Sequence, residues 1–255
     1  MTEAREPVDL TGRRVLVTGG ASGIGAACAR RFAAAGAHVV VADLDSGGAQ
    51  RVASALGGEA RPVDLADPGF DAAALAGAAD IIVNNAGLQH VSPVEEFPED
   101  RFRLLLAVML EAPFRLVRAA LPHMYRQGFG RIVNISSVHG LRASAFKCAY
   151  VAAKHGLEGL SKTIALEGGS RGVTSNTICP AYVRTPLVEG QIADQAAVHR
   201  IPPEEVVSRI MLTEPAIKRL VEPDEVAELA VYLCGPHASF ANGASFVLDG
   251  GWTAR

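Results

Sequence analysis

Aromatic residues and cysteines are scarce in this chain of 255 residues, and neither sign of charge dominates it. Aromatic residues make up 5% and the formal net charge is -3, so no basic field marks a nucleic-acid-binding surface. The four cysteines stand far apart and form no C-x-x-C pair, which favours core thiols in a reducing compartment. We therefore expect no nucleic-acid partner.

Long apolar runs and metal-ligand patterns are absent as well. Apolar runs such as residues 104–110 are far shorter than the ~20 residues that a membrane span needs, and no signal peptide is apparent. The histidines show no spacing of the H-E-x-x-H kind, so no metal is assigned. The sequence thus predicts a cytoplasmic protein without membrane contact.

Short apolar strands alternate with helical patterns along the chain. With 49% hydrophobic residues and no internal repeat, the length suits one large α/β core. The alternation predicts a single doubly wound parallel sheet of the Rossmann type over residues 10–255, with ligands at the carboxyl ends of its strands. Residues 187–220 break the alternation and predict a helical lid, and residues 1–9 predict a flexible tail. The expected strands are residues 14–18, 38–42, 61–63, 80–84, 131–135, 174–179 and 244–248, and the expected helices include 26–35, 100–125, 150–167 and 224–233.

A glycine-rich turn follows the first expected strand and opens the first expected helix. Gly19, Gly23 and Gly25 permit a tight turn, close approach of the backbone to a pyrophosphate, and close packing of the helix. The next strand ends at Asp43, eighteen residues after Gly25, where a carboxylate meets the adenosine ribose of a dinucleotide. Because a 2′-phosphate would be repelled there, and no Arg or Lys in the turn would attract one, the sequence favours NAD over NADP.

Tyr150 and Lys154 stand four residues apart in an expected helix, and Ser137 follows the strand before it. Positions i and i+4 share one face of a helix, so the ammonium group of Lys154 lies near the phenol of Tyr150 and favours its ionised form. An unperturbed phenol titrates near pH ~10 and a useful base near ~7, so the site must shift the pKa by about 3 units. Lysine, a cationic nicotinamide and a serine hydroxyl would together supply that shift. The alternative is a chance pair on a helix surface.

Together these motifs resemble the short-chain dehydrogenase/reductase family over residues 10–252. The glycine turn, the Asn-Asn-Ala-Gly run at residues 84–87, Ser137 and the Tyr150–Lys154 pair occur in the family's order and at its intervals. The resemblance implies that Tyr150 is the catalytic acid or base, that Lys154 lowers its pKa and holds the nicotinamide ribose, and that Ser137 orients the substrate oxygen. It departs at Ala181, where the family usually has glycine. It also implies a cofactor-binding surface made of Thr18, Gly19, Ser22, Gly23, Ile24, Gly25, Asp43, Asp64, Leu65, Asn85, Ala86, Gly87, Tyr150, Lys154, Pro180, Val183 and Thr185.

Polar residues near these motifs indicate a small carboxylate substrate. Four side chains could converge as donors on an anion beside the reacting carbon: Gln89, His139, Lys147 and Gln191. With Ser137 and Tyr150, they match the substrate-binding residues of the family's D-3-hydroxybutyrate dehydrogenases, and Trp252 matches a residue near the substrate pocket. The resemblance implies reversible NAD-dependent oxidation of 3-hydroxybutyrate to acetoacetate by a homotetramer.

Each of these residues has a simpler structural alternative. His139 would cap a loop, Lys147 would be a solvated charge, Gln89 and Gln191 would be surface polar groups, and Trp252 would pack at an interface. Within the enzyme class, a 3-oxoacyl thioester reductase, which should prefer NADPH, and other short-chain alcohol dehydrogenases are the alternatives. Outside it, the alternative is a catalytically weak dinucleotide-binding sensor or scaffold.

Met109, in the longest expected helix, departs from the family pattern. Family members usually have an asparagine there, which holds a helix distortion whose free main-chain carbonyl binds a water leading to the catalytic lysine. Methionine lacks those hydrogen bonds, and the alternative for it is a flexible core filler. Pro113, four residues later, has no N–H to bond the Met109 carbonyl, so that carbonyl stays free whatever the side chain. We expect Pro113 to preserve the relay toward Lys154.

Overall fold

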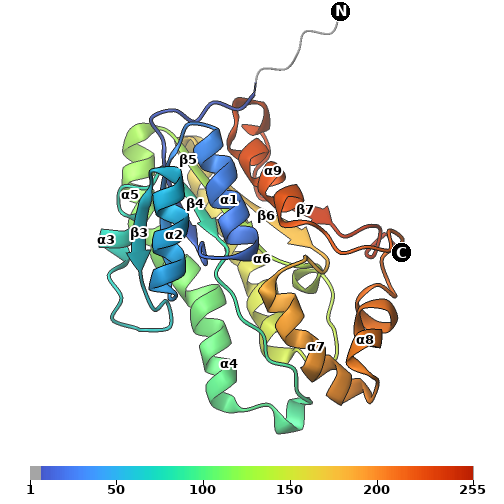
Figure 1. Cartoon of the computed structure of the whole chain (residues 1–255). Helices are drawn as coiled ribbons and strands as arrows, with labels where there is room; N and C mark the ends of the chain where they lie inside the picture. The colour runs from blue at the N-terminus through green and yellow to red at the C-terminus, as the bar shows by residue number, and fades with distance from the viewer. Residues whose placement is uncertain (1–6, 255) are drawn as a thin grey trace, which may run out of the picture.

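A seven-stranded parallel sheet forms the centre of the protein in a computed structural model that describes residues 7–254 (Figure 1). The strand order is β3-β2-β1-β4-β5-β6-β7, so the chain winds outward from β1 in one direction and then from β4 in the other. This is the doubly wound parallel sheet that the sequence predicts. The strands are β1 (Arg14–Thr18), β2 (His38–Asp43), β3 (Glu59–Pro62), β4 (Ile81–Asn84), β5 (Gly130–Ile135), β6 (Val173–Pro180) and β7 (Ser245–Leu248).

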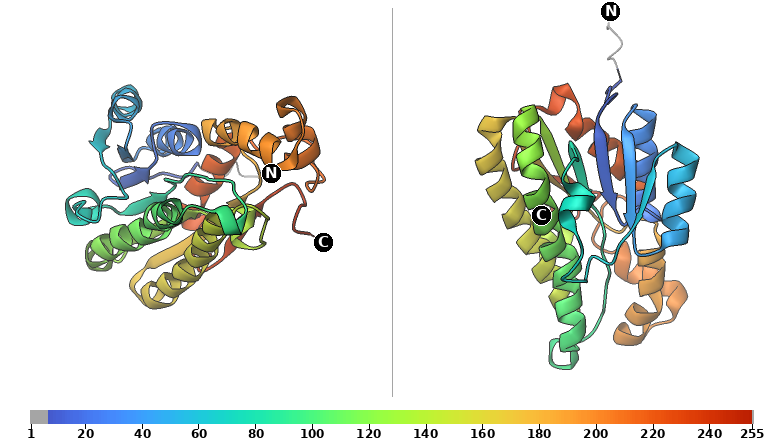
Figure 2. Two further views of the ribbon diagram at one scale, coloured as in Figure 1. Left: turned by 90° about the horizontal axis from the view of Figure 1, so that it is seen from below. Right: turned by 90° about the vertical axis from the view of Figure 1, so that its left-hand side faces the viewer.

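Helices cover both faces of this sheet (Figure 2). One layer contains α1, α2 and α9, and the other contains α3, α5 and α6. Strands covered on both faces have no solvent side, which explains why β1, β4 and β6 read as continuous buried runs rather than alternating ones. The α-helices are α1 (Gly23–Ala34), α2 (Ser46–Leu56), α3 (Ala72–Ala76), α4 (Glu99–Leu106), α5 (Ala112–Gln127), α6 (Cys148–Gly168), α7 (Pro186–His199), α8 (Pro203–Val206) and α9 (Pro223–Cys234).

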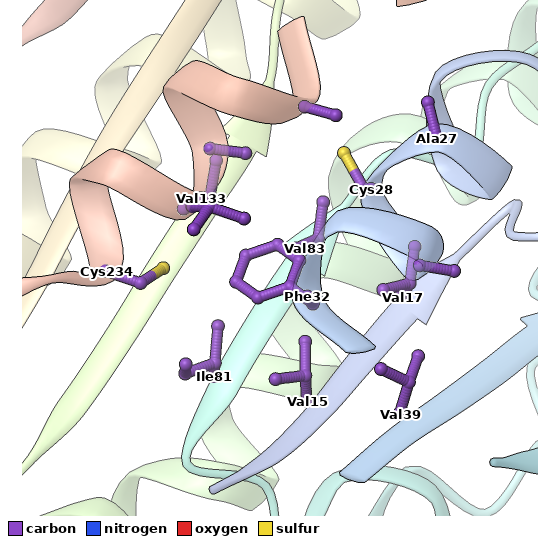
Figure 3. Packing of buried hydrophobic residues seen from close by; sticks show 14 of the residues in the cluster. Val15, Val17, Ala27, Cys28, Phe32, Val39, Ile81, Val83, Val133 and Cys234 are labelled. Atoms are coloured by element: carbon purple, nitrogen blue, oxygen red, sulfur yellow. The ribbon is translucent and has the colours of Figure 1, made fainter. Parts of the chain in front are cut away.

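Phe32 of α1 anchors the first helical layer on the sheet. It is fully buried and lies among Val15, Ile81, Val83 and other small apolar residues (Figure 3). Burial of an aromatic side chain of this size stabilises the folded state by about 1.5 to 3 kcal/mol. The packing fixes α1 against β1 and β4, and so fixes the glycine turn that precedes the helix.

The long helix expected over residues 100–125 is distorted at one point in the structure. A π-helical segment, Ala107–Glu111, separates α4 from α5, and the N–H of Ala112 bonds the carbonyl of Ala107 rather than that of a residue four positions back. Met109 lies in this segment, is 1% exposed, and packs against Ala149 and Ala153 of α6. The prediction of a helix over this range is confirmed, since residues 99–127 are helical throughout, and the π-helical turn at Met109 is a local distortion within it.

Residues 187–220 form a separate layer beside the strand ends. Helices α7 and α8 and a second π-helical segment, Val207–Met211, enclose a small apolar cluster of their own. Figure 1 shows these helices in orange, below the carboxyl ends of the strands. This placement agrees with a helical lid, although α7 begins at Pro186.

The expected flexible tail at residues 1–9 lies mostly outside the described residues. Residues 1–6 cannot be compared, but Val8 is partly buried and packs against the core beside Gly235. Asp9 accepts hydrogen bonds from the N–H and hydroxyl of Thr11. The packed chain thus begins before the predicted boundary at residue 10. Over the described range, no helix is both long and apolar enough to cross a membrane.

Candidate active site

A cavity of about 610 Å³ opens at the carboxyl ends of the strands. The strands β1, β2, β4, β5 and β6 all end at it or immediately beside it, as expected for a doubly wound sheet. Of the site residues predicted from the sequence, only Thr18 and Gly25 lie behind its wall. The others line it: Gly19, Ser22, Gly23, Ile24, Asp43, Asp64, Leu65, Asn85, Ala86, Gly87, Gln89, Ser137, His139, Lys147, Tyr150, Lys154, Pro180, Val183, Thr185, Gln191 and Trp252.

The glycine turn leaves no room for side chains. A Cβ on Gly25 would lie 2.0 Å from the carbonyl oxygen of Gly19, and one on Gly19, where φ is +63°, would lie 2.8 Å from the Cα of Ala86. The Nδ2 of Asn85 donates to the carbonyl oxygens of Thr18 and Gly19, at 2.9 and 3.0 Å. The hydroxyl of Thr18 accepts from the N–H groups of Asn85 and Ala86. Thr18 therefore supports the cradle from behind.

The first turn of α1 offers an anion site at the floor of the cavity. Ser22 is the N-cap residue, but its side chain makes no capping hydrogen bond, so its hydroxyl is available to a ligand. The N–H groups of a helix start and its dipole both favour a phosphate there. A Cβ on Gly23 would lie 3.0 Å from the Cγ2 of Thr185, the N-cap residue of α7. The start of α7 is therefore packed closely against this turn.

Asp43 stands at the end of β2, where the adenosine end of a dinucleotide would lie. One carboxylate oxygen accepts from the N–H of Ala21 in the glycine turn and the other accepts from the N–H of Asp45, both at 2.9 Å. The carboxylate is thus fixed in place and tied to the turn. Leu44, which is 73% exposed, lies beside it, and Asp64 and Leu65 line the cavity nearby.

Tyr150, Lys154 and Ser137 lie together in the wall of the cavity. The Nζ of Lys154 lies 5.5 Å from the centre of the Tyr150 ring and donates to the carbonyl oxygen of Ile135 at 2.7 Å. Ser137 caps a short 3-10 turn and accepts from the N–H of His139 at 3.1 Å. Its hydroxyl is also hydrogen-bonded to Tyr150. The i, i+4 spacing and the strand end bring these three groups together.

Burial opposes the ionisation that Tyr150 needs. It raises the pKa of Tyr150 to about 12, although the hydrogen bond to Ser137 acts in the opposite direction, and it lowers the pKa of Lys154 to about 8. The protein alone therefore does not supply the shift toward neutrality that the sequence argument requires. A cationic ring bound against Tyr150 would supply the missing positive charge, and the glycine cradle, Ser22 and Asp43 fit a nicotinamide dinucleotide.

The substrate end of the cavity is built around Lys147. This side chain is 2% exposed, and its Nζ donates to the hydroxyl oxygen of Tyr182 at 3.0 Å. Tyr182 stacks on Trp252 with ring centres 5.9 Å apart, and His139 packs edge-on against Trp252 at 5.5 Å. Burial lowers the pKa of Lys147 to about 8. Lys147 is thus a buried ammonium group at the cavity and not a solvated surface charge.

Lys147 is one of four predicted donors, and the other three are Gln191, His139 and Gln89. The Nε2 of Gln191 donates to the carbonyl oxygen of Leu187. Its Oε1 is buried and has no hydrogen-bond partner in the described part of the chain. Burial, with the charge of Lys147, lowers the pKa of His139 to about 3, so its ring is neutral near pH 7. Gln89 accepts from the N–H of His90 through Oε1, and its Nε2 can donate.

Tyr182 is the functional residue that sequence reasoning missed. It lies two residues after Pro180, at the end of β6, and lines the cavity. The signal in the sequence was an aromatic residue two positions after this strand, and it does not by itself place the side chain in the cavity. Because its hydroxyl accepts from Lys147, its own O–H remains free to donate to an anion.

The fold and this group of residues define a nicotinamide-dependent oxidoreductase of the short-chain dehydrogenase/reductase family, to which the chain belongs. A family model described as Enoyl-(Acyl carrier protein) reductase matches residues 19–253. The chain is 44% identical to a D-beta-hydroxybutyrate dehydrogenase of Rhizobium meliloti, over 95% of this chain and 99% of that one. It is 40% identical to a D-beta-hydroxybutyrate dehydrogenase of Cupriavidus necator, over 96% and 100%.

Other similar proteins are named for different alcohols. A D-threitol dehydrogenase of Mycolicibacterium smegmatis is 38% identical over the full length of both chains. A solved structure from Beutenbergia cavernae is described as a putative NAD(P) dependent gluconate 5-dehydrogenase with bound NADP at low occupancy. It is 36% identical, has a TM-score of 0.85, and the match covers 98% of this chain and 100% of that one. These comparisons establish the family and the nicotinamide chemistry, and they leave the substrate to be argued from the site.

Proposed function

We propose that the protein oxidises 3-hydroxybutyrate to acetoacetate with NAD. The observation that carries this proposal is the buried Lys147 ammonium group in the same cavity as Tyr150. A buried cation is costly unless an anion joins it, and a substrate carboxylate is such an anion. A small 3-hydroxy acid places a carboxylate and a reacting hydroxyl in one short molecule.

Tyr150 acts as the base. It removes the proton of the substrate hydroxyl, and the Ser137 hydroxyl bonds the same oxygen and holds it in line. Lys154, one helical turn from Tyr150, stabilises the phenolate by its positive charge. When bound, NAD would accept the hydride from the carbon that carries this oxygen.

Three groups hold the carboxylate in this proposal. Lys147 provides the charge, and the hydroxyl of Tyr182 and the Nε2 of Gln89 provide further donors. The rings of Trp252 and Tyr182 are stacked with an angle of 21° between their planes. In this proposal, Trp252 therefore shields the ion pair between Lys147 and the substrate carboxylate from water. A shielded ion pair is stronger than an exposed one, which favours a charged substrate over a neutral alcohol of the same size.

We also propose NAD as the cofactor. The fixed carboxylate of Asp43 supports this, because it would repel a 2′-phosphate at the ribose. The Beutenbergia cavernae structure contains NADP, so both dinucleotides must be tested. The exposed Leu44 beside Asp43 provides an apolar surface for the adenine ring.

Initial rates with a panel of alcohols test the proposal. Formation of reduced nicotinamide, followed by its absorbance, measures turnover. We expect kcat/KM to be higher for 3-hydroxybutyrate than for threitol, gluconate or an uncharged secondary alcohol. We also expect kcat/KM for 3-hydroxybutyrate to be lower when NADP replaces NAD. A higher kcat/KM for a polyol would reject the substrate assignment. Absence of turnover with every alcohol would instead favour a dinucleotide-binding sensor or scaffold.

A polyol dehydrogenase is the second candidate. The unpartnered Oε1 of Gln191 is an acceptor, and an additional hydroxyl of a polyol would donate to it. A 3-oxoacyl thioester reductase is less well supported, because Asp43 disfavours NADPH. Neither a neutral polyol nor a thioester places a carboxylate beside the buried charge of Lys147, so both reactions are less well supported than oxidation of the hydroxy acid.

We propose a homotetramer in the cytoplasm. Large apolar side chains that a subunit contact would cover are exposed on or beside three elements: Leu166 on α6, Tyr232 on α9, Val247 on β7 and Phe240 before it. The four cysteines are free thiols, which suits a reducing compartment. Light scattering of the purified protein would test the assembly.

A further inference from the structure

Helix α6 carries three ionisable side chains in one row. Tyr150, Lys154 and Glu158 follow each other at four-residue intervals, so they share the face that packs on the sheet. Glu158 is 4% exposed, as is Lys154. A carboxylate buried to this degree costs several kcal/mol unless it is paired. Its position one helical turn below Lys154 therefore requires a physical reason.

Glu158 accepts three hydrogen bonds from the strands beneath α6. The hydroxyls of Thr177 and Ser245 donate to Oε2 at 2.9 and 2.6 Å, and the thiol of Cys179 donates to Oε1 at 3.2 Å. All three groups donate hydrogen bonds to the Glu158 side chain. A carboxylate is an acceptor at both oxygens, so it satisfies every one of these contacts.

Glu158 is the negative charge that acts on Lys154. Burial lowers the pKa of Lys154 to about 8, and Cys179 and Glu158 oppose that shift. Burial also raises the pKa of Cys179 to about 12, so near neutral pH it is an uncharged thiol. Among the other described elements packed on this face, the turn Val138–Gly140 contributes His139, which is neutral, and β7 contributes no ionisable group.

We propose that Glu158 is a positioning residue, whose buried charge keeps Lys154 protonated and aimed at Tyr150. It acts on the proton transfer through Lys154 and touches neither substrate nor cofactor. The proposal rests on the proposed role of Tyr150 as the base, but not on the identity of the alcohol. Because Glu158 lies two turns from Tyr150, its direct effect on the phenol is weaker than its effect through the intervening lysine.

The titration of Lys154 tests the proposal without turnover. The sequence contains only four lysines, so lysine labelled with carbon-13 at Cε gives a simple NMR spectrum, and loss of one signal in Lys154→Arg assigns Lys154. In Glu158→Gln, the titration midpoint of Lys154 should fall by about 1 unit or more. The control is Ser245→Ala, which removes one donor to Glu158 and retains its charge, and which should leave the midpoint nearly unchanged.

The second readout is the pH profile of kcat, measured with any secondary alcohol that the enzyme oxidises. We expect the acidic limb of kcat to move to higher pH by about 1 unit in Glu158→Gln, and to return in Glu158→Asp. Glu158→Leu serves if the glutamine variant does not fold, because apolar replacement of a buried charge is often tolerated. An unchanged Lys154 midpoint in a folded uncharged variant would overturn the proposal. Failure to oxidise 3-hydroxybutyrate would instead contradict only the substrate.

Discussion

The Nζ of Lys147 and the hydroxyl oxygen of Tyr182 lie 3.0 Å apart at the substrate end of the cavity. Lys147 precedes α6 and Tyr182 follows β6, so the sheet brings together two residues that are 35 positions apart in the chain. The pair combines a buried charge with a free hydroxyl proton. In the proposed reaction, this pair distinguishes a carboxylate from a neutral group.

Removing the Lys147 charge should impair the hydroxy acid selectively. In Lys147→Ala, we expect KM for 3-hydroxybutyrate to rise at least about 30-fold, because the loss of a buried charged partner costs about 2 kcal/mol or more. Tyr182→Phe, which retains the stacked ring, should raise KM by a smaller factor of about 5. Steady-state kinetics with an uncharged secondary alcohol are the control, and equal losses for both substrates would show that Lys147 supports the fold or Tyr150.

Binding of the carboxylate should weaken in alkaline solution. The pKa of Lys147 is lowered to about 8 in the ligand-free protein, so the ammonium form that attracts the substrate is present below that pH and is lost above it. KM for 3-hydroxybutyrate should then be flat from about pH 6 to 8 and rise toward 10-fold per unit above pH 8. His139, with a pKa of about 3, adds no step in this range. A KM that rises equally for an uncharged alcohol would contradict the assignment to Lys147.

The sequence predicted the cofactor half of the site more completely than the substrate half. Gly19, Gly25 and Asp43 belong to a single strand-turn-helix-strand unit, so local spacing fixes their geometry. Tyr182 and Gln191 depend on how the end of β6 and α7 approach the cavity, which no local pattern specifies. The direction of the Gln191 amide follows from a bond to the carbonyl of Leu187, four residues earlier in α7, and the residue pattern alone does not reveal that bond.

Asp43 should control the choice of dinucleotide. Asp43→Ala removes the charge and the bond to the N–H of Ala21, so NAD binding should weaken by about 1 to 3 kcal/mol and the preference over NADP should narrow. Asp43→Asn is the matched variant, because its amide oxygen can still accept from Ala21 while the charge is gone. Comparing both dissociation constants in the two variants separates repulsion of the phosphate from support of the turn. Unchanged selectivity in Asp43→Asn would rule out the electrostatic explanation.

The close contact in the glycine turn predicts that alanine is tolerated far less well at Gly25 than at Gly190. Gly25→Ala would place a Cβ 2.0 Å from the Gly19 carbonyl, so the turn must open, and NAD binding and the melting temperature should both fall. Gly190→Ala is the control, because that position in α7 has nothing within 4 Å of an added Cβ, and alanine stabilises a helix interior by about 1 kcal/mol relative to glycine. Calorimetry with and without NAD measures both effects. Tight NAD binding by Gly25→Ala would refute the role of the turn as a phosphate cradle.

Pro113 should matter for turnover because it cannot donate a helical hydrogen bond to the Met109 carbonyl. It stands four residues after Met109, at the junction of the π-helical segment with α5, and as a proline it cannot donate to the Met109 carbonyl. Met109 itself packs against α6 near Tyr150, so this carbonyl lies on the element that borders the catalytic helix. If it holds a water that exchanges protons with Lys154, Pro113→Ala should restore a helical hydrogen bond, lower kcat and shift its pH profile, while the dissociation constant for NAD changes little. Pro122→Ala, a second proline inside α5 and farther from Met109, is the matched control for the loss of a proline. Parental kcat and an unshifted profile in a folded Pro113→Ala protein would defeat the relay.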